Sequence, residues 1–279
     1  MIRATEIRQI AARQNIRPDV IEKDYVLSWV IAALNQQEIS NKWIFKGGTA
    51  LKKCYFQEYR FSEDLDYSVI NEDDLTEEKL IEIMNSITSW IYSRSGIELL
   101  AKRQKVEILH NLNNSLIAQV RLYYKGPVSP SSIQQDPRIK LDLTSGEFLT
   151  DKPILSNIYH PYTDEALFNP QTLCYSFSEI FAEKLRAFVE RCRPRDIYDI
   201  VHCFEDKQAN IEEVVFMFKQ KCEAKNIKNL NITTIEKQIT SAKHAWSEQL
   251  AHQIQDLGVF DDFADKSIKI MSHILRLYG

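Results

Sequence analysis

The sequence of 279 residues is poor in glycine: it has 7, where average usage of about 7% would give roughly twenty. Glycine supplies turns, bulges and close approaches of the backbone, so a chain this short of it is expected to be mostly helical. Two of the seven, Gly47 and Gly48, are adjacent, and none lies between Gly146 and Gly258. We therefore expect glycine to remain only where the backbone geometry requires it.

Cysteine pairs, histidine pairs and long apolar runs are also missing. The five cysteines form no C-x-x-C pair and the six histidines no H-x-x-x-H pair, which excludes a disulfide scaffold and gives no zinc signature. The longest fully apolar run, residues 29–34, is too short to span a bilayer. The first residues lack the apolar core of a signal peptide. These absences predict a soluble, cytoplasmic protein with reduced thiols.

The chain has no excess of charge of one sign. It contains 35 Lys and Arg against 39 Asp and Glu, a net charge of −4, without a basic arm or an acidic tail. A protein that binds nucleic acid mainly by neutralising phosphates is therefore disfavoured, although a local basic cleft stays open. The hydrophobic content of 44% is that of an ordinary globule, which excludes a disordered chain and a collagen-like repeat.

The spacing of apolar residues divides the chain into two parts. In the first part, alternation predicts strands at 43–45, 61–69, 97–109, 115–124 and 139–143, and helical spacing predicts helices at 5–14, 18–35 and 72–95. In the second part, helices are predicted at 177–192, 195–206, 211–224, 233–254 and 259–277. The predicted fold class is α+β, with a mixed sheet and flanking helices over 1–165 and a C-terminal helical bundle over 166–279.

The adjacent glycines lie between a predicted strand and a predicted helix. A glycine pair at Gly47 and Gly48, followed by Thr49, lets the backbone come close to a ligand, and amides at the start of a helix favour an anion. A tight turn without a ligand is the alternative, because short glycine motifs are weak signals. In a chain with five other glycines, the pair is a stronger candidate for a functional turn.

Carboxylates occur at two places on the predicted strands. Strand geometry directs Asp64 and Asp66 to one face, with their Cα atoms about 6.6 Å apart. Two carboxylates held in this way can share Mg²⁺ ions with substrate phosphates; a solvated acidic turn is the alternative. Asp142, on the polar face of the strand at 139–143, either faces solvent or supplies a third carboxylate for a two-metal displacement.

The helices predicted at 177–192 and 195–206 are rich in charge. Asp196 and Asp199 are spaced at i and i+3, so they share a helix face. Five cations of this region could hold a triphosphate: Lys184, Arg186, Arg191, Arg193 and Arg195. Salt-bridged surface helices would give the same pattern, and the charges alone leave both interpretations open.

Taken in order, these motifs resemble the AbiEii/AbiGii-type nucleotidyltransferase toxin family of the polymerase-β-like nucleotidyltransferase superfamily. The resemblance runs from about residue 20 to residue 200, and the rest of the chain is similar only as a helical tail. The segments that carry it are 22–25, 45–51, 60–66, 140–142, 183–187 and 195–199.

The resemblance implies a Mg²⁺-dependent or Mn²⁺-dependent enzyme that transfers a nucleotide from an NTP to RNA, such as tRNA. It implies the toxin of a bacterial toxin–antitoxin or phage-defence (abortive infection) system, with an antitoxin encoded nearby. By motif position, the nucleotide would be bound by Lys46, Gly47, Gly48, Thr49, Ser62, Lys184, Arg186 and Asp196. Catalysis would depend on Asp64, Asp66, Asp142, Lys184 and Asp199. The metal would be bound by Asp64, Asp66 and Asp142; a site with only the first two acids is the alternative.

Two other functions fit the same core. A small-molecule nucleotidyltransferase, of the kind that inactivates aminoglycosides, would use the same acids and differ in its acceptor. A non-catalytic nucleotide-binding protein on the same fold would bind NTPs without turnover, but the intact pair of Asp64 and Asp66 disfavours it.

Overall fold

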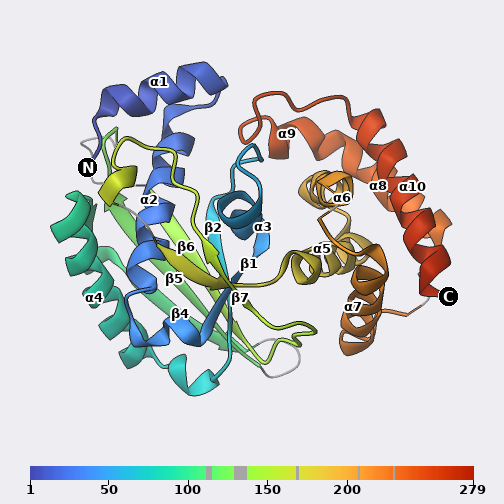
Figure 1. Cartoon of the computed structure of the whole chain (residues 1–279), viewed down its shortest axis with the longest axis horizontal. Coiled ribbons are helices and arrows are strands. Elements are labelled where there is room, and N and C mark those ends of the chain that lie inside the picture. Colours follow the sequence, from blue (N-terminus) through green and yellow to red (C-terminus); the bar gives the residue numbers. More distant parts are fainter. Residues whose placement is uncertain (111–114, 129–136, 168–169, 207, 229) are drawn as a thin grey trace. The chain divides into compact units, whose positions relative to one another are not determined.

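The computed structural model describes residues 1–110, 115–128, 137–167, 170–206, 208–228 and 230–279 (Figure 1). Contacts within the chain separate two compact units. The first contains residues 1–147 and 153–174, and the second contains residues 148–152 and 175–279. Within these described ranges, none of the helices is both long enough and apolar enough to cross a membrane.

The first unit is built on one mixed sheet. Its strands in the described residues are β1 (Trp43–Lys46), β2 (Asp64–Val69), β3 (Glu98–Leu99), β4 (Lys105–His110), β5 (Leu116–Lys125), β6 (Arg138–Ser145), β7 (Ile154–Asn157) and β8 (Gln171–Cys174). Their order is β3-β5-β6-β2-β1-β8-β7, and β4 also pairs with β5. The pairs β2/β6 and β1/β8 are parallel, and the others are antiparallel. The two parallel pairs bring together segments that are far apart in the sequence.

One face of the sheet is apolar and covered. Every second residue of β5 and β6 is fully buried, from Ala118 to Tyr124 and from Ile139 to Leu143. Helices α2 and α4 pack on each other, α4 contacts β3 and β4, and α2 contacts β8. The residues between the buried ones point to the opposite side because side chains alternate along a strand. We call this side the polar face; it carries Lys46, Asp64, Asp66, Ser68, Gln119, Arg121, Tyr123, Arg138, Lys140, Asp142 and Thr144.

The helices of the first unit begin and end at residues suited to those positions. They are α1 (Ala4–Gln14), α2 (Pro18–Leu34), α3 (Gly47–Ala50) and α4 (Glu77–Ser95), and α3 continues into one π-helical turn, η2 (Leu51–Tyr55). Pro18 occupies the first turn of α2, where its missing N–H is harmless. The Thr76 hydroxyl accepts a hydrogen bond from Lys79 N at 3.4 Å and caps α4. Gly96, with φ +74°, ends that helix.

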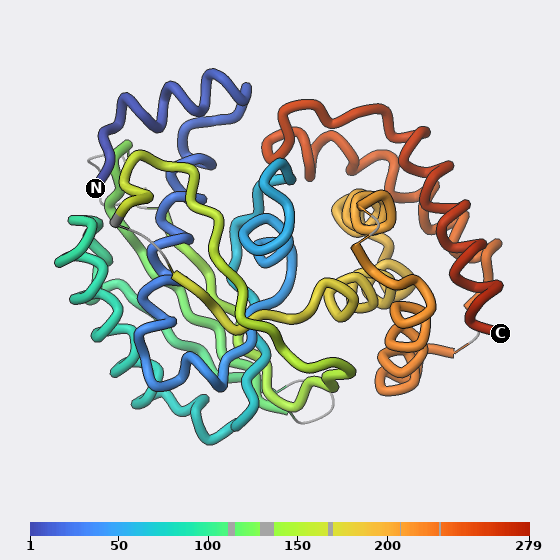
Figure 2. The backbone as a smooth tube through the Cα atoms, viewed as in Figure 1, coloured from blue at the N-terminus to red at the C-terminus, as the bar shows by residue number. Residues whose placement is uncertain are grey.

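The second unit is helical. It contains α5 (Phe177–Arg191), α6 (Pro194–Asp206), α7 (Ile211–Ala224), α8 (Ile232–Ala242), α9 (Trp246–Leu250) and α10 (Phe260–Tyr278), which Figure 2 draws from yellow to red. Helix α5 packs on α6 and α7, and α10 packs on α6, α7 and α8. Phe181, Phe188 and Phe218 are buried in its core. Short 3₁₀ turns among the described residues are η1 (Glu38–Asn41), η3 (Glu72–Asp74), η4 (Ala101–Arg103), η6 (Glu165–Leu167) and η7 (Lys243–Ala245).

The predicted fold class, α+β with a helical C-terminal part, is confirmed. Several elements differ from the prediction. The strand predicted at 97–109 is two strands, β3 and β4, separated by η4, and the helix predicted at 233–254 is interrupted between α8 and α9. Strands β7 and β8 were not predicted, because four-residue strands carry little periodicity.

The division between the units also differs from the expected boundary after residue 165. Strand β8 pairs with β7 and with β1, so the first unit extends to Cys174. Residues 148–152 belong to the second unit although they precede β7 in the sequence. Composition does not reveal this exchange, because it depends on pairing between distant segments.

Candidate active site

The two adjacent glycines are the first two residues of α3 and directly follow β1 in a tight turn. Gly47 has φ +82°, and a Cβ atom there would overlap the carboxylate of Asp66. A Cβ atom on Gly48 would lie 2.7 Å from the Arg60 guanidinium and 3.2 Å from Ser62 Oγ. Thr49 donates a hydrogen bond from its hydroxyl to the carbonyl oxygen of Asp64. The backbone conformation at position 47 therefore requires glycine, whereas Gly48 leaves room for the Arg60 and Ser62 side chains. The hydrogen bond from Thr49 holds this segment to β2 beside the acids.

The three predicted acids lie together on the polar face. The parallel pairing of β2 and β6 places Asp66 opposite Asp142 and Asp64 opposite Lys140. Burial, together with the negative charges of Asp66 and Asp142, raises the pKa of Asp64 above its usual value, which Lys140 opposes. Sequence alone placed Asp64 and Asp66 on one face, and the strand pairing adds Asp142 beside them.

The two carboxylate oxygens of Asp142 have different surroundings. Its Oδ2 accepts from Lys140 Nζ at 2.8 Å, whereas its Oδ1 is buried and has no hydrogen-bond partner in the described part of the chain. A buried carboxylate oxygen without a partner is costly unless another group satisfies it. The polar face therefore contains an oxygen suited to a cation or to a proton donor from a substrate.

These residues fit a divalent cation in part. Among the described residues, no group of three or more His, Cys, Asp and Glu side chains is arranged to hold a metal ion. Asp142 is engaged by Lys140, but Asp64 and Asp66 are oxygen donors whose mutual repulsion a divalent cation would relieve. The donor set thus suits Mg²⁺ through two acids, and Asp142 as third ligand stays a prediction.

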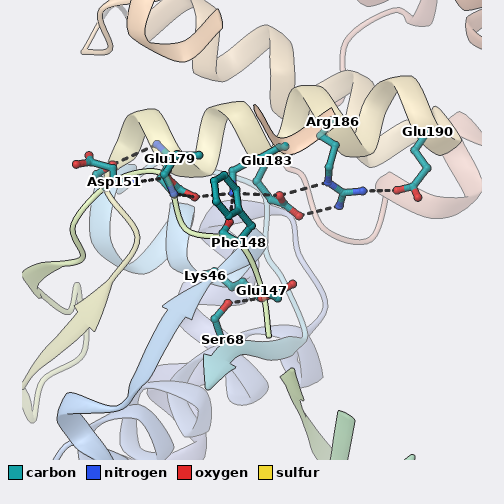
Figure 3. A network of polar contacts seen from close by, with 12 residues as sticks. Lys46, Ser68, Glu147, Phe148, Asp151, Glu179, Glu183, Arg186 and Glu190 are labelled. Atoms are coloured by element: carbon teal, nitrogen blue, oxygen red, sulfur yellow. Dashed lines mark hydrogen bonds and ion pairs between the residues drawn. The ribbon is translucent and has the colours of Figure 1, made fainter. Parts of the chain in front are cut away.

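Lys46 has a carboxylate partner that sequence analysis missed. Its Nζ forms an ion pair with Glu147, and Glu147 also accepts a hydrogen bond from the Ser68 hydroxyl (Figure 3). Glu147 follows Gly146, whose φ of +66° turns the chain after β6. The sequence signal that could have identified Glu147 was its position directly after a glycine at the end of a predicted strand. Lys46, predicted to bind nucleotide, is therefore neutralised within the first unit.

The early motif at residues 22–25 acts as an anchor for the segments that carry the site. Lys23 pairs with Glu63 at 2.7 Å, next to Asp64. Glu22 accepts from the amide of Val128, and the Tyr25 hydroxyl donates to Asp164 at 2.8 Å. The role of this motif is thus structural: it ties α2 to the approach of β2 and to the loops around it.

A buried ion pair completes this anchor. Lys53 Nζ lies 2.7 Å from Asp24 Oδ2, and both side chains are almost fully buried. Burial raises the pKa of Asp24, but the charges of Lys53 and Lys52, together with hydrogen bonds from Lys53 and Tyr162, outweigh burial and hold that pKa below its usual value. Burial also lowers the pKa of the adjacent Lys52 to about 8. The turn after α3 is thereby fixed to α2 by charge as well as by packing.

The four other predicted site residues lie in the second unit, where each is engaged by a neighbouring side chain. Lys184 Nζ is 2.8 Å from Asp199 Oδ2, and Asp199 is fully buried. The carboxylate of Asp196, also fully buried, accepts from the Arg191 guanidinium at 2.9 and 3.0 Å. Arg186 pairs with Glu183 at 2.7 Å and with Glu190 (Figure 3). Asp196 and Asp199 are therefore buried partners of basic side chains rather than groups on an exposed surface.

Residues 148–152 are held to the second unit by a buried ion pair that was not predicted. Lys221 lies 2.5 Å from Glu179, and both side chains are almost fully buried. Glu179 accepts from the amides of Thr150 at 3.1 Å and Asp151 at 2.9 Å, and Lys221 donates to the Phe148 carbonyl at 3.2 Å. No spacing pattern in the sequence connects residue 221 to residue 179.

Comparison with known proteins identifies the fold and the family. The structure resembles MenT4, a nucleotidyltransferase toxin from Mycobacterium tuberculosis H37Rv, with a TM-score of 0.67 and 18% identity, over 99% of this chain and 90% of that chain. At this identity the likeness shows the fold. No curated protein sequence matches the chain. The family described as nucleotidyl transferase AbiEii toxin, type IV toxin–antitoxin system, matches residues 29–266. That match covers most of the chain, which therefore belongs to the AbiEii family of nucleotidyltransferase toxins.

Proposed function

We propose that this nucleotidyltransferase moves a nucleotide from an NTP to an RNA acceptor, with tRNA the first candidate, and depends on Mg²⁺ or Mn²⁺. The observation that carries the proposal is the row formed by Asp64, Asp66 and Asp142 on the polar face, beside the turn at Gly47 and Gly48. The NTP phosphates need close backbone approach and a cation-binding pair of acids, and both are next to each other here.

Each of the proposed site residues has its own role. Gly47 and Gly48 let the triphosphate lie against the backbone, and Asp64 and Asp66 would hold the divalent cation. That cation, when bound, neutralises phosphate charge and orients the triphosphate. Asp142 takes the proton of the attacking hydroxyl at Oδ1, which has no hydrogen-bond partner among the described residues. The hydroxyl oxygen bonds to the α-phosphorus and pyrophosphate leaves, so catalysis rests mainly on positioning and charge.

Lys46 and Lys184 are the proposed phosphate contacts, and each is held by an acid. Glu147 restrains Lys46 in the first unit, and Asp199 restrains Lys184 in the second. A lysine held by a carboxylate has fewer conformations to lose when it meets a phosphate. Asp199 is thus a positioning residue. Ser62, close to Gly48, and Arg186 complete the proposed nucleotide contacts.

The proposed setting is a bacterial toxin–antitoxin or phage-defence (abortive infection) system, with the enzyme in the cytoplasm. The type IV toxin–antitoxin family to which the chain belongs implies a cognate antitoxin. A neighbouring gene for that antitoxin should suppress the growth arrest caused by expressing this chain alone.

The test is incorporation of labelled nucleotide into RNA. The purified chain is incubated with total cellular RNA, Mg²⁺ and each of the four α-labelled NTPs, and the products are separated by size. We expect one RNA class to be labelled with one or two NTPs, and labelling to stop in Asp64→Asn. Labelling that persists in Asp64→Asn would contradict the assignment of the site.

Two controls separate the alternatives. A panel of aminoglycosides replaces RNA in a parallel reaction, and labelling of a drug without labelling of RNA would favour a small-molecule transferase. Binding of NTPs without transfer to any acceptor would favour a non-catalytic protein. Tyr92→Ser, an exposed substitution on α4, is the matched variant and should leave labelling unchanged.

A further inference from the structure

Three cations surround one tyrosine on the polar face, at a distance from the acids. The Arg103 guanidinium lies over the Tyr123 ring, 4.5 Å from its centroid. Arg138 hydrogen-bonds the Tyr123 hydroxyl, and together with the charges of Lys105 and Arg103 it lowers the pKa of that phenol. We call these four residues the Tyr123 cluster. Each comes from a different element: η4, β4, β5 and β6.

Strand register connects this cluster to the carboxylates without interruption. Tyr123 is opposite Arg138, Arg121 is opposite Lys140, and Gln119 is opposite Asp142. Lys140 is in turn opposite Asp64. Along β6, Arg138 and Asp142 are four residues apart on the same face, which is about 13 Å at about 3.3 Å per residue. The cluster and the acids are therefore two ends of one continuous surface.

The charge of this surface contrasts with that of the chain. The chain carries a net charge of −4, yet the positions between the cluster and the acids hold mostly cations. Arg121 is paired with Glu107 at 2.9 Å, and Lys140 with Asp142 at 2.8 Å. Lys105 and Arg138 are exposed. Arg121 and Lys140 are thus balanced by acids, and the excess of positive charge on this surface is that of the Tyr123 cluster itself.

We propose that the Tyr123 cluster binds the single-stranded end of the acceptor RNA and leads its terminal hydroxyl toward Asp142. The proposal rests on the proposed function and assigns it an acceptor site. Arg103 and Arg138 bind backbone phosphates, and a base stacks against the Tyr123 ring. Lys105 adds positive charge at the edge of the cluster. Basic residues that alternate with an aromatic side chain are the chemistry of single-stranded nucleic acid binding.

Two features favour RNA over an acidic protein as the occupant. The cluster contains an aromatic ring held in place by two guanidinium groups, which suits a base better than a carboxylate side chain. The surface also continues by register into the acids proposed to act on the acceptor hydroxyl. An acidic partner protein would have no reason to extend toward those acids.

The experiment measures RNA affinity and transfer separately. Binding of a fluorescein-labelled tRNA to the full chain is followed by anisotropy at several salt concentrations, and transfer is followed with labelled NTP. The variants are Tyr123→Ala, Tyr123→Phe, Arg103→Glu and Arg138→Glu. Arg8→Glu is the matched control, because Arg8 is exposed on α1, and α1 packs on α2, away from the polar face.

Tyr123→Ala should weaken tRNA binding about tenfold, whereas Tyr123→Phe should stay close to the wild type because it keeps the ring. Each Arg→Glu change should weaken binding and reduce the slope of log affinity against log salt by about 1 or more. Arg8→Glu should change neither. NTP binding should be unchanged in all variants, because none of these residues contacts the glycine turn.

The outcomes distinguish the two proposals. If the wild type labels RNA, and the cluster variants retain wild-type affinity and salt slope, the acceptor site is overturned while the function stands. If the wild type neither binds nor labels RNA, the proposed RNA function fails and this site fails with it. Loss of binding in Arg8→Glu equal to that in Arg138→Glu would also overturn a specific site.

Discussion

The polar face of the first unit and the α5–α6 helix pair of the second unit handle charge in opposite ways. In the helix pair, Asp199 and Asp196 are fully buried, and each is matched by a basic side chain. On the polar face, like charges are adjacent: Asp64 lies near Asp66 and Asp142, and its pKa is raised by burial and by their charges. Pairing with a base stabilises a buried carboxylate, whereas neighbouring carboxylates repel one another and favour a cation or a proton between them. Charge therefore stabilises the fold in the helix pair, and on the polar face it favours the binding of a cation.

The largest effect on stability should come from breaking the buried ion pair between Lys184 and Asp199 in the second unit. Asp199→Asn leaves the Lys184 ammonium beside a neutral group, and removing one partner of a buried ion pair costs about 3–5 kcal/mol. Urea unfolding of the variant and the wild type measures this difference. The double variant Lys184→Met with Asp199→Leu should recover most of the loss, because two apolar side chains leave no unpaired charge.

Transfer activity separates a positioning role of Asp199 from a purely structural one. The double variant should fold and still transfer poorly, since it lacks the Lys184 ammonium. Full activity in that variant would show that the pair serves only the fold. A loss below about 1 kcal/mol in Asp199→Asn would contradict the contrast between the regions.

A smaller effect on stability is expected at the glycine turn. Gly47→Ala places a Cβ at φ +82° against the Asp66 carboxylate, and a left-handed conformation alone costs an alanine about 1–2 kcal/mol. The matched control is Gly96→Ala, at φ +74° with only Met1 Cβ within 4 Å of the new atom, at 3.9 Å. Gly47→Ala should lose at least as much stability as Gly96→Ala by thermal unfolding, and only Gly47→Ala should lose transfer, by about tenfold or more. Equal activity in the two would remove the turn from the site.

These regions also differ in how far the sequence predicted them. Alternation along one strand is a local pattern, so Asp64 and Asp66 were correctly placed on one face. The neighbour Asp142 depends on parallel pairing between β2 and β6, which are separated by three intervening strands in the sequence. No local pattern specifies that pairing or its register. The acid could be proposed from the resemblance, but its position had to come from the fold.

In the second unit, the helices could be predicted from the sequence, but the partners of their charged side chains could not. Two of its helices were predicted closely, since α7 has the predicted bounds and α5 ends one residue early. For the cations on those helices, however, the sequence left open whether they bind a triphosphate or form salt bridges, and in the structure Arg186 and Arg191 have carboxylate partners. Periodicity identifies which residues share a helix face, but not which neighbouring side chain each will meet. Glu147 and Lys221 were missed for the same reason.

Removing an acid from the polar face should leave stability close to that of the wild type. Asp64→Asn eliminates one of the like charges next to Asp66, so its free energy of unfolding at neutral pH should equal or exceed that of the wild type, within about 1 kcal/mol. Urea unfolding under the conditions used for Asp199→Asn gives the comparison. Transfer should nevertheless be lost. Destabilisation as large as that of Asp199→Asn would show that the two regions use charge in the same way.

The smallest effect is the pH dependence of the difference in the free energy of unfolding between the wild type and Asp64→Asn. Its sign follows from the direction in which the pKa of Asp64 is shifted. Because the pKa of Asp64 is raised in the folded state, the folded chain takes up this proton at a higher pH than the unfolded chain. As pH falls from neutral through the raised pKa toward about 3.9, the wild type should gain stability relative to Asp64→Asn. The pKa of Asp24, lowered by Lys53, gives the opposite sign: its stabilisation is present at neutral pH and is lost in acid. Transfer should fall as Asp64 is protonated, so the polar face gains stability over the pH range in which it loses function.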